Sequence, residues 1–414
     1  MSAAHQAPRH APCRDSLLLA AGSVVSGVLA YVLFALVTRG LGATAAAPVS
    51  VLWTVWALAG AAFTFPLQHW ITRCLVAGRE PEVRASARRV ATVVAGAAVA
   101  AGSLSWVARE RLFQRDDAAF PVLVALVVLG SAAVGVLRGA LAGRGRMAAV
   151  AWSLVAENAV RCALVSVLLV AQVVDPVAHG LCLVAGSLVV LRPGAWRFAE
   201  AGKDRAGSLA FLGGAATAQV LAQGVLTGGS VVLALLGGSP AQITAMFATL
   251  ALFRAPYMVV LGTLPQVTHY VTGLVVAGDL GTLRSRARQL AVLGAVTVVL
   301  GSLVGLLVGP QLVRAVFGGT VEVGQDVTGL VAAGCALALV NVVLMVGALA
   351  LGRPGRVAAV WGVAVATGAV ALLPSAYGPA ERVATAFVTA EVAATVLLAV
   401  VASAALRTAR APAV

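Results

Sequence analysis

The chain contains few charged residues, few aromatic residues and almost no lysine. Only 11% of its 414 residues are Asp, Glu, Lys or Arg, and aromatic residues make up 5%. An ordinary soluble domain is about 25% charged, so this composition excludes a soluble globular fold. The five cysteines follow no spacing typical of a metal site or a disulfide framework. A nucleotide-binding loop is also missing, so neither ATP hydrolysis nor a bound cofactor is expected.

Apolar residues dominate what remains. They make up 61% of the chain, and its mean hydropathy is +0.99. They form long runs separated by short polar turns, which is typical of helices that cross a bilayer and satisfy their own backbone hydrogen bonds. The sequence therefore predicts an all-α polytopic membrane protein. We expect twelve spans, at about 16–38, 47–69, 90–108, 120–138, 147–171, 176–191, 208–236, 240–273, 289–308, 326–350, 357–374 and 382–406.

Two pairs of segments repeat each other. Residues 69–88 read HWITRCLVAGREPEVRASAR, and residues 269–288 read HYVTGLVVAGDLGTLRSRAR. GALAGRGRMAAVAW from Gly139 is echoed by GALALGRPGRVAAVW from Gly347. Such self-similarity indicates that the two halves share one plan. We therefore expect two pseudo-symmetric six-helix lobes in the same membrane orientation, around a central cavity.

The expected organisation has five parts. They are a disordered cytoplasmic tail (1–15), an N-terminal lobe (16–191), a cytoplasmic linker (192–207), a C-terminal lobe (208–406) and a cytoplasmic tail (407–414). In the eighth span, Pro256 and Pro265 should kink the helix. Small-residue ridges in the fourth span (Gly135 and Gly139) and the ninth (Gly301, Gly305 and Gly309) should let helices approach closely.

The distribution of basic residues predicts the orientation. With the N-terminus in the cytoplasm, the inner segments hold 21 Lys and Arg and the outer segments hold 6. The positive-inside rule then places both termini in the cytoplasm. Anionic lipid on that side attracts basic loops, which accounts for the net charge of +14 without a nucleic-acid partner.

Glu157 and Arg161 are charged residues inside the fifth span. They lie four residues apart, which puts them on one helical face. An uncompensated arginine at the centre of a span costs about 2.5–3.5 kcal/mol on insertion scales. The two residues could form an internal ion pair that holds helices together, or they could line the cavity and re-pair during transport.

Two further arginines are candidates for substrate contact. Arg254 lies beside Pro256 with no acidic residue one turn away, and a guanidinium there could bind a phosphate in bidentate fashion. Its alternatives are a distant pair with Glu391 or Glu157, or a lipid-facing position. Arg39, at the outer end of the first span, could be an interface anchor or a ligand.

Polar residues on other spans complete the candidate site. Gln219 and Gln223 share one face of the seventh span with Thr227, where they could bond a neighbouring helix or sugar hydroxyls. Glu157 and Glu391 provide one buried acidic residue in each half, which is the arrangement that cation coupling would need. Asn158, Asn341 and Glu391 are by default inter-helix hydrogen-bonding residues.

Several short segments resemble polysaccharide flippases of the multidrug/oligosaccharidyl-lipid/polysaccharide (MOP) superfamily. They are LVTRGLG (36–42), RGALAGRGR (138–146), VLALLGG (232–238), ALFRAPYMVVLGTLPQV (251–267) and GPQLVRAVFGG (309–319). The resemblance implies two lobes that open alternately to either side of the cytoplasmic membrane. It also implies an anionic lipid-linked glycan as the substrate and makes glycan-assembly enzymes candidate partners.

Four classes of function remain on the sequence alone. A flippase or exporter of a lipid-linked oligosaccharide or polysaccharide precursor is favoured. A cation-coupled small-molecule (multidrug-type) antiporter of the same superfamily is the alternative. A membrane enzyme is disfavoured because long outer loops are missing and the only adjacent acidic pair is Asp116–Asp117. The fourth class is a scaffold that transports nothing.

Overall fold

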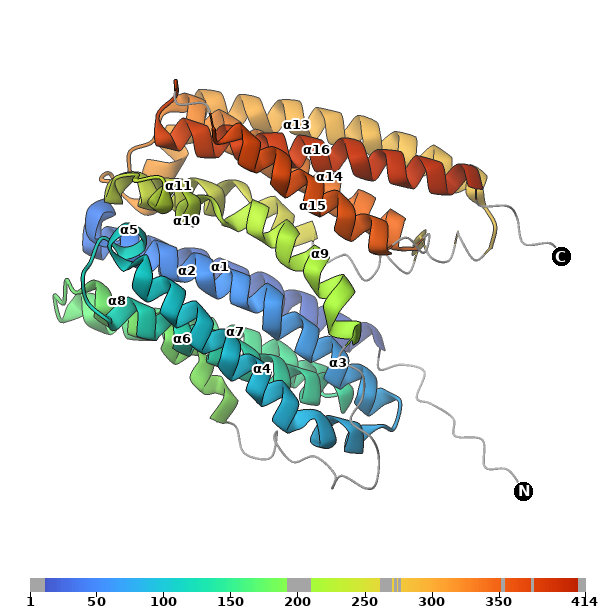
Figure 1. The fold of residues 1–414 in the computed structure, drawn as a ribbon, viewed down its shortest axis with the longest axis horizontal. Coiled ribbons are helices and arrows are strands. Elements are labelled where there is room, and N and C mark those ends of the chain that lie inside the picture. The colour runs from blue at the N-terminus through green and yellow to red at the C-terminus, as the bar shows by residue number, and fades with distance from the viewer. Residues whose placement is uncertain are drawn as a thin grey trace.

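The computed structural model describes residues 12–191, 210–260, 270–271, 274, 277–350, 354–373 and 376–408. In these residues every regular element is a helix. Figure 1 shows two stacks of roughly parallel helices, one formed by the first half of the chain and one by the second. The predicted linker 192–207 and Pro265 lie outside the described residues.

The N-terminal lobe contains six membrane-crossing segments. The first is α1 (Pro12–Ala45), which begins within the tail expected at residues 1–15. The second combines α2, the π-helix η1 and α3, and the sixth combines α8 with the 3₁₀ helix η2. After α1, the elements of this lobe are α2 (Ala47–Ala59), η1 (Gly60–Thr64), α3 (Phe65–Val76), α4 (Glu80–Val107), α5 (Arg109–Phe113), α6 (Ala119–Gly143), α7 (Met147–Val170), α8 (Pro176–Ala185) and η2 (Gly186–Leu191).

The C-terminal lobe follows the same plan with one strongly bent segment. Two helices, α9 and α10, meet at an angle of 67° around Gly228. The elements are α9 (Ala210–Thr227), α10 (Gly229–Leu235), α11 (Pro240–Phe253), α13 (Leu280–Phe317), α14 (Gln325–Ala350), α15 (Pro354–Ala371) and α16 (Pro379–Thr408). As expected from Pro256, α11 ends just before that proline, at Phe253.

The prediction of a twelve-helix, two-lobe membrane protein is confirmed. Among the described residues, eight helices are long and apolar enough to span a membrane, α9 and α10 form one bent span, and three shorter apolar helices complete the set. Two helices start well before the spans that hydropathy predicts, α4 at Glu80 and α13 at Leu280. Hydropathy marks only the part of each helix that lies in the bilayer. The first turns of α4 and α13 carry arginines and extend beyond that part.

The repeat of residues 69–88 and 269–288 is visible in the backbone. Gly78 and Gly278 both have φ of 70°, in the left-handed region that favours glycine. The helices that follow begin 200 residues apart, at Glu80 and Leu280. The described part of the second copy therefore repeats the turn and helix start of the first, which supports the duplication inferred from the sequence.

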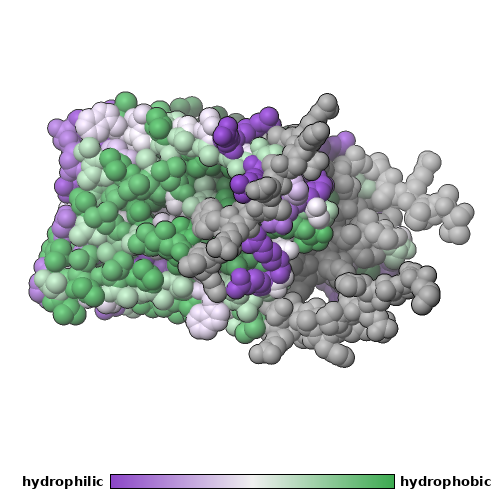
Figure 2. Space-filling view, turned by 90° about the horizontal axis from the view of Figure 1, so that it is seen from below, coloured by the Kyte–Doolittle hydropathy of each residue, from purple (hydrophilic) through white to green (hydrophobic). Residues whose placement is uncertain are grey.

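The two ends of the bundle differ in the segments that they carry. We call the end that contains α5 the α5 end, and the end where α1 begins and α16 ends the terminal end (Figure 1). Between them, the face seen in Figure 2 is mostly apolar, with polar residues gathered toward the two ends. Large apolar side chains remain exposed along α13, from Leu290 to Leu312. Such a surface suits a lipid environment.

Small residues bring helices together within each lobe, as the ridges predict. A Cβ added at Gly135 of α6 would lie 2.7 Å from the carbonyl oxygen of Thr64 in η1. A Cβ at Gly305 of α13 would lie 2.6 Å from the carbonyl oxygen of Thr328 in α14. Both contacts are too short for any larger side chain.

The connection between α4 and α6 at the α5 end is held by local ion pairs. Arg109 contacts Asp116, and Arg115 Nη2 lies 2.6 Å from Asp117. The hydrogen bond from the Arg115 guanidinium holds the pKa of the Asp117 carboxyl below its ordinary value. These pairs neutralise two of the arginines that the sequence places on the outer side.

Candidate functional site

Four aromatic side chains join the two lobes in the half of the bundle nearer the α5 end. Phe34 of α1 and Trp53 of α2 come from the N-terminal lobe, and Phe247 of α11 and Phe317 of α13 come from the C-terminal lobe. The ring centroid of Phe34 lies 4.4 Å from that of Phe247 and 5.3 Å from that of Phe317, and Trp53 lies 5.9 Å from Phe247. All four are buried. We call this cluster the aromatic seal.

Hydrogen bonds between the lobes surround the aromatic seal. Three of them are Thr54 Oγ1 with Ser230 Oγ (2.6 Å), Thr244 Oγ1 to the carbonyl of Ala43 (2.6 Å) and Tyr31 Oη to the carbonyl of Ala251 (2.6 Å). These three hydrogen bonds lie between the middle of the bundle and the α5 end. The lobes are therefore closed against each other at the α5 end.

Arg254 lies at the lobe interface where α11 ends. It is the C-cap residue of α11, and its guanidinium stands 5.8 Å from the ring centroid of Phe247 in the aromatic seal. It also interacts with the Tyr31 hydroxyl of the opposite lobe. Its side chain is partly exposed. Within the described ranges no ion pair joins Arg254 to a carboxylate, so the pairing alternatives with Glu157 and Glu391 are not observed.

Glu157 lies at the centre of a buried network in the N-terminal lobe. Its two carboxylate oxygens accept from two different arginines: Arg161 Nη2 at 2.7 Å and Arg138 Nη2 at 2.5 Å. Arg161 and Glu157 are 1% and 4% exposed, respectively. The ion pair that the four-residue spacing indicates is thus present, and in this structure it lies inside the lobe.

Arg161 also links three other segments of the lobe. Its Nε donates to the carbonyl of Leu183 at 2.9 Å and its Nη1 to Asn158 Oδ1 at 3.0 Å. Asn158 in turn donates to the Ser26 hydroxyl of α1 at 2.9 Å. The guanidinium lies 4.6 Å from the ring centroid of Trp56 in α2, a cation–π distance. The network therefore fixes α1, α2, α7 and α8 relative to one another.

Sequence reasoning missed Arg138. It counted this residue with the basic loop that joins the fourth and fifth spans, because RGALAGRGR holds three arginines in nine residues. In the structure α6 continues to Gly143, and Arg138 is a buried residue inside it. One chemical argument could have indicated it. A carboxylate can accept hydrogen bonds from two guanidinium groups, and the four-residue spacing assigns only Arg161 to Glu157.

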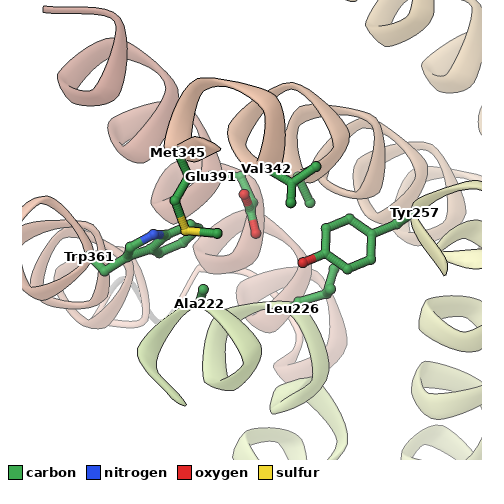
Figure 3. A pocket seen from close by; sticks show the side chains of 8 residues that line it. Ala222, Leu226, Tyr257, Val342, Met345, Trp361 and Glu391 are labelled. Carbon is green, nitrogen blue, oxygen red and sulfur yellow. The ribbon is translucent and has the colours of Figure 1, made fainter. Parts of the chain in front are cut away.

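Glu391 of α16 is the buried carboxyl of the C-terminal lobe. It is 0% exposed, and Asn341 of α14 donates to its Oε2 at 2.7 Å. In the part of the chain that the structure describes, Glu391 Oε1, Asn341 Oδ1 and Trp361 Nε1 have no hydrogen-bond partner. Figure 3 shows Glu391 facing a small cavity with Tyr257, Met345 and Trp361. This cavity has about 10 Å³ of room for the centre of a water molecule, enough for one water.

The remaining sequence candidates lie apart from these clusters. Gln219 and Gln223 are partly exposed on α9, and Thr227 donates to the carbonyl of Gln223 at 2.7 Å, just before the bend. Arg39 is exposed near the α5 end, where it contacts the last turn of α13. The structure therefore brings Arg254 to the lobe interface, whereas it places Glu157 and Arg161 inside one lobe.

Comparisons with known proteins identify the fold. No family model and no curated protein sequence matches the chain. Among solved structures, an inward-facing multidrug resistance MATE family transporter of the MOP superfamily has a TM-score of 0.65 and 13% identity, covering 92% of this chain and 96% of its own. The eukaryotic MATE transporter AtDTX14 has a TM-score of 0.60 and 14% identity, covering 96% and 98%.

A third similar structure is a MOP superfamily transporter from Pyrococcus furiosus, described as having a binding pocket of reverse polarity. It has a TM-score of 0.59 and 11% identity, covering 96% of this chain and 95% of its own. At these identities the likeness concerns the fold alone. The chain is therefore a multi-pass membrane protein with the fold of MATE transporters of the MOP superfamily.

Proposed function

We propose that the protein is an alternating-access transporter that moves an anionic lipid-linked oligosaccharide or polysaccharide precursor across the cytoplasmic membrane. The observation that carries this proposal is Arg254, a partly exposed guanidinium at the lobe interface with no described carboxylate partner. Retaining such a charge in a span is costly, and a phosphate or diphosphate head group would compensate it with bidentate hydrogen bonds.

The closed α5 end supports the same proposal. A transporter of this kind alternates between states in which one end of the lobe interface is closed. The aromatic seal and its surrounding hydrogen bonds provide such a closure. Arg254 lies beyond the seal, toward the terminal end, where a substrate would arrive in this state. The positive-inside rule favours a cytoplasmic terminal end, which is the side from which an exported precursor would enter.

Substitution of Arg254 tests the proposal. Arg254→Ala should abolish export, and Arg254→Lys should lose much of the same activity, because an ammonium cannot reproduce the bidentate fork. The measurement is accumulation of lipid-linked oligosaccharide on the inner leaflet of cells that express each variant at matched levels. The matched control is Arg382→Ala, since Arg382 caps the carbonyl of Leu372 within one lobe. Wild-type export by Arg254→Ala would remove Arg254 from the site and contradict the proposal.

A second candidate function, cation-coupled antiport of small molecules, is favoured by Glu391. An isolated buried carboxylate is strongly disfavoured, and no described basic side chain pairs with Glu391. A proton or a small cation would have to accompany its burial. Glu157 is a weaker candidate for coupling, because two arginines already compensate its charge.

Liposomes separate the two functions. In an antiporter, adding a transported drug should dissipate an imposed proton or sodium gradient, and Glu391→Gln should stop this while Arg254→Ala leaves it intact. A flippase would instead expose the inner-leaflet copies of a fluorescent lipid-linked glycan to a quencher outside the vesicle, and Arg254→Ala would leave those copies protected. Gradient dissipation that survives Glu391→Gln would exclude Glu391 as the coupling residue.

A further inference from the structure

The C-terminal end of α13 receives hydrogen bonds from the opposite lobe. The last four carbonyls of a helix have no partner within the helix. In α13 the first of these four, on Arg314, accepts from the backbone N–H of Gly318 at 2.9 Å. The other three accept from α1: Arg39 Nη2 to Ala315 (2.7 Å), Arg39 Nε to Val316 (3.3 Å) and Thr38 Oγ1 to Phe317 (2.8 Å).

This arrangement suits a guanidinium in three ways. The C-terminal end of a helix carries a partial negative charge, which favours a cation there. The planar guanidinium presents N–H groups in a fixed fork, and Arg39 uses two of them on consecutive carbonyls. The chain then leaves the helix through Gly318 with φ of 107°, and a Cβ at that glycine would lie 3.3 Å from the side chain of Arg39. A larger residue at 318 would therefore crowd the arginine.

We propose that the C-terminal end of α13 is a guanidinium-binding site and that Arg39, with Thr38, latches the two lobes together at the α5 end by occupying it. Opening of this end withdraws the arginine and leaves the three carbonyls to water. This proposal depends on the proposed function in one respect, which is that transport requires the lobes to separate at the α5 end. Because Arg39 is exposed, each of its contacts contributes little to the stability of the closed state. Together we expect them to change the ratio of closed to open molecules by about fivefold.

Arg382 provides a matched comparison within the same protein. It caps the carbonyl of Leu372, near the end of α15, from the start of α16. This contact has the same chemistry as that of Arg39, but both partners belong to the C-terminal lobe. Loss of Arg382 should therefore loosen one loop and leave the balance between closed and open lobes unchanged.

The labelling rate of a buried cysteine measures that balance. Ser230 is 0% exposed, and its hydroxyl contacts Thr54 of the other lobe, so Ser230→Cys becomes reactive only when the α5 end opens. The full-length protein in nanodiscs, with its native cysteines replaced, is treated with a charged, membrane-impermeant thiol reagent. We expect Arg39→Ala to label about fivefold faster than the parent. Arg39→Lys should fall between them, because an ammonium lacks the planar fork.

Free guanidinium tests the chemistry of the site. Guanidinium chloride at a sub-denaturing concentration should compete with Arg39 for the carbonyls and speed the labelling of the parent toward the Arg39→Ala rate, whereas sodium chloride at equal ionic strength should not. Unchanged labelling in Arg39→Ala, equal acceleration in Arg382→Ala or failure of guanidinium to speed the labelling of the parent would each overturn the latch. Labelling requires no substrate. A protein that fails the export test and still shows these rates would therefore contradict the proposed function and leave the latch intact.

Discussion

Replacing Glu157 should destabilise the protein more than replacing either of its arginine partners. The network of Arg138, Glu157 and Arg161 carries a net charge of +1 in a region that water does not reach. Glu157→Gln leaves two buried guanidinium groups without a counter-charge. Breaking a buried pair in this way costs about 3–5 kcal/mol.

Arg161→Met is expected to be milder because it leaves Glu157 and Arg138 as a neutral pair. Its cost comes from Asn158 Oδ1, the carbonyl of Leu183 and Glu157 Oε1, which lose their donors. At about 1 kcal/mol for each acceptor, the total is about 3 kcal/mol, the lower limit of the loss expected for Glu157→Gln.

The double variant of Glu157→Gln with Arg161→Met separates this network from a simple two-residue pair. Its loss should be smaller than the sum of the two single losses by about 1–3 kcal/mol. It should not regain wild-type stability, because Arg138 is still unpaired. Adding Arg138→Met removes the last charge, so the triple variant should recover the part of the loss that comes from the unpaired guanidinium, while the acceptors that Arg161 satisfied stay unpaired.

Reversible unfolding in mixed micelles measures these differences as free energies of unfolding. Glu391→Gln is the matched control, since it makes the same chemical change at a buried glutamate with no described ion pair, and it should cost little. Equal losses for Glu157→Gln and Glu391→Gln would refute the reasoning, as would additive losses in the double variant.

Three further results are expected. Gly186→Ala should lower stability about as much as loss of Arg161, because its Cβ would lie 2.2 Å from the Arg161 Nε, and thermal unfolding of the purified variant checks this. Thr54→Cys with Ser230→Cys should form a disulfide that blocks transport until it is reduced, because the two hydroxyl oxygens lie 2.6 Å apart across the lobes; a crosslinked protein with full activity would contradict this. The ion pair of Asp117, whose pKa is lowered, should hold its loop above about pH 4 and release it as the pH falls through that pKa. Proteolysis of the loop at graded pH, compared with Asp117→Asn, measures this release.

Much of the fold could be predicted because hydropathy and duplication act along the chain. Each span needs its own apolar run, and a repeated segment repeats its turn, as Gly78 and Gly278 do. Hydropathy did not locate the first turns of α4 and α13, because these turns are helical but polar. The bend at Gly228 was not predicted either, since neighbouring helices determine where a glycine-rich span breaks.

The candidate site could be predicted only where its residues share a helix. Glu157 and Arg161 lie one turn apart, so the spacing alone brings them together. Arg138 joins them from another helix, and the sequence offers no local sign of this contact. Asn341 and Glu391 are 50 residues apart and meet because α14 packs against α16. Contacts of this kind depend on helix packing, which composition and periodicity do not determine.

The bend between α9 and α10 makes α9 a lever. Its 18 residues extend about 27 Å at a rise of about 1.5 Å per residue. A change of about 10° at Gly228 would therefore displace the far end of α9 by about 5 Å. Since α9 contacts α15 of its own lobe and also α2, η1 and α3 of the other, a small rotation at one glycine would move one lobe against the other.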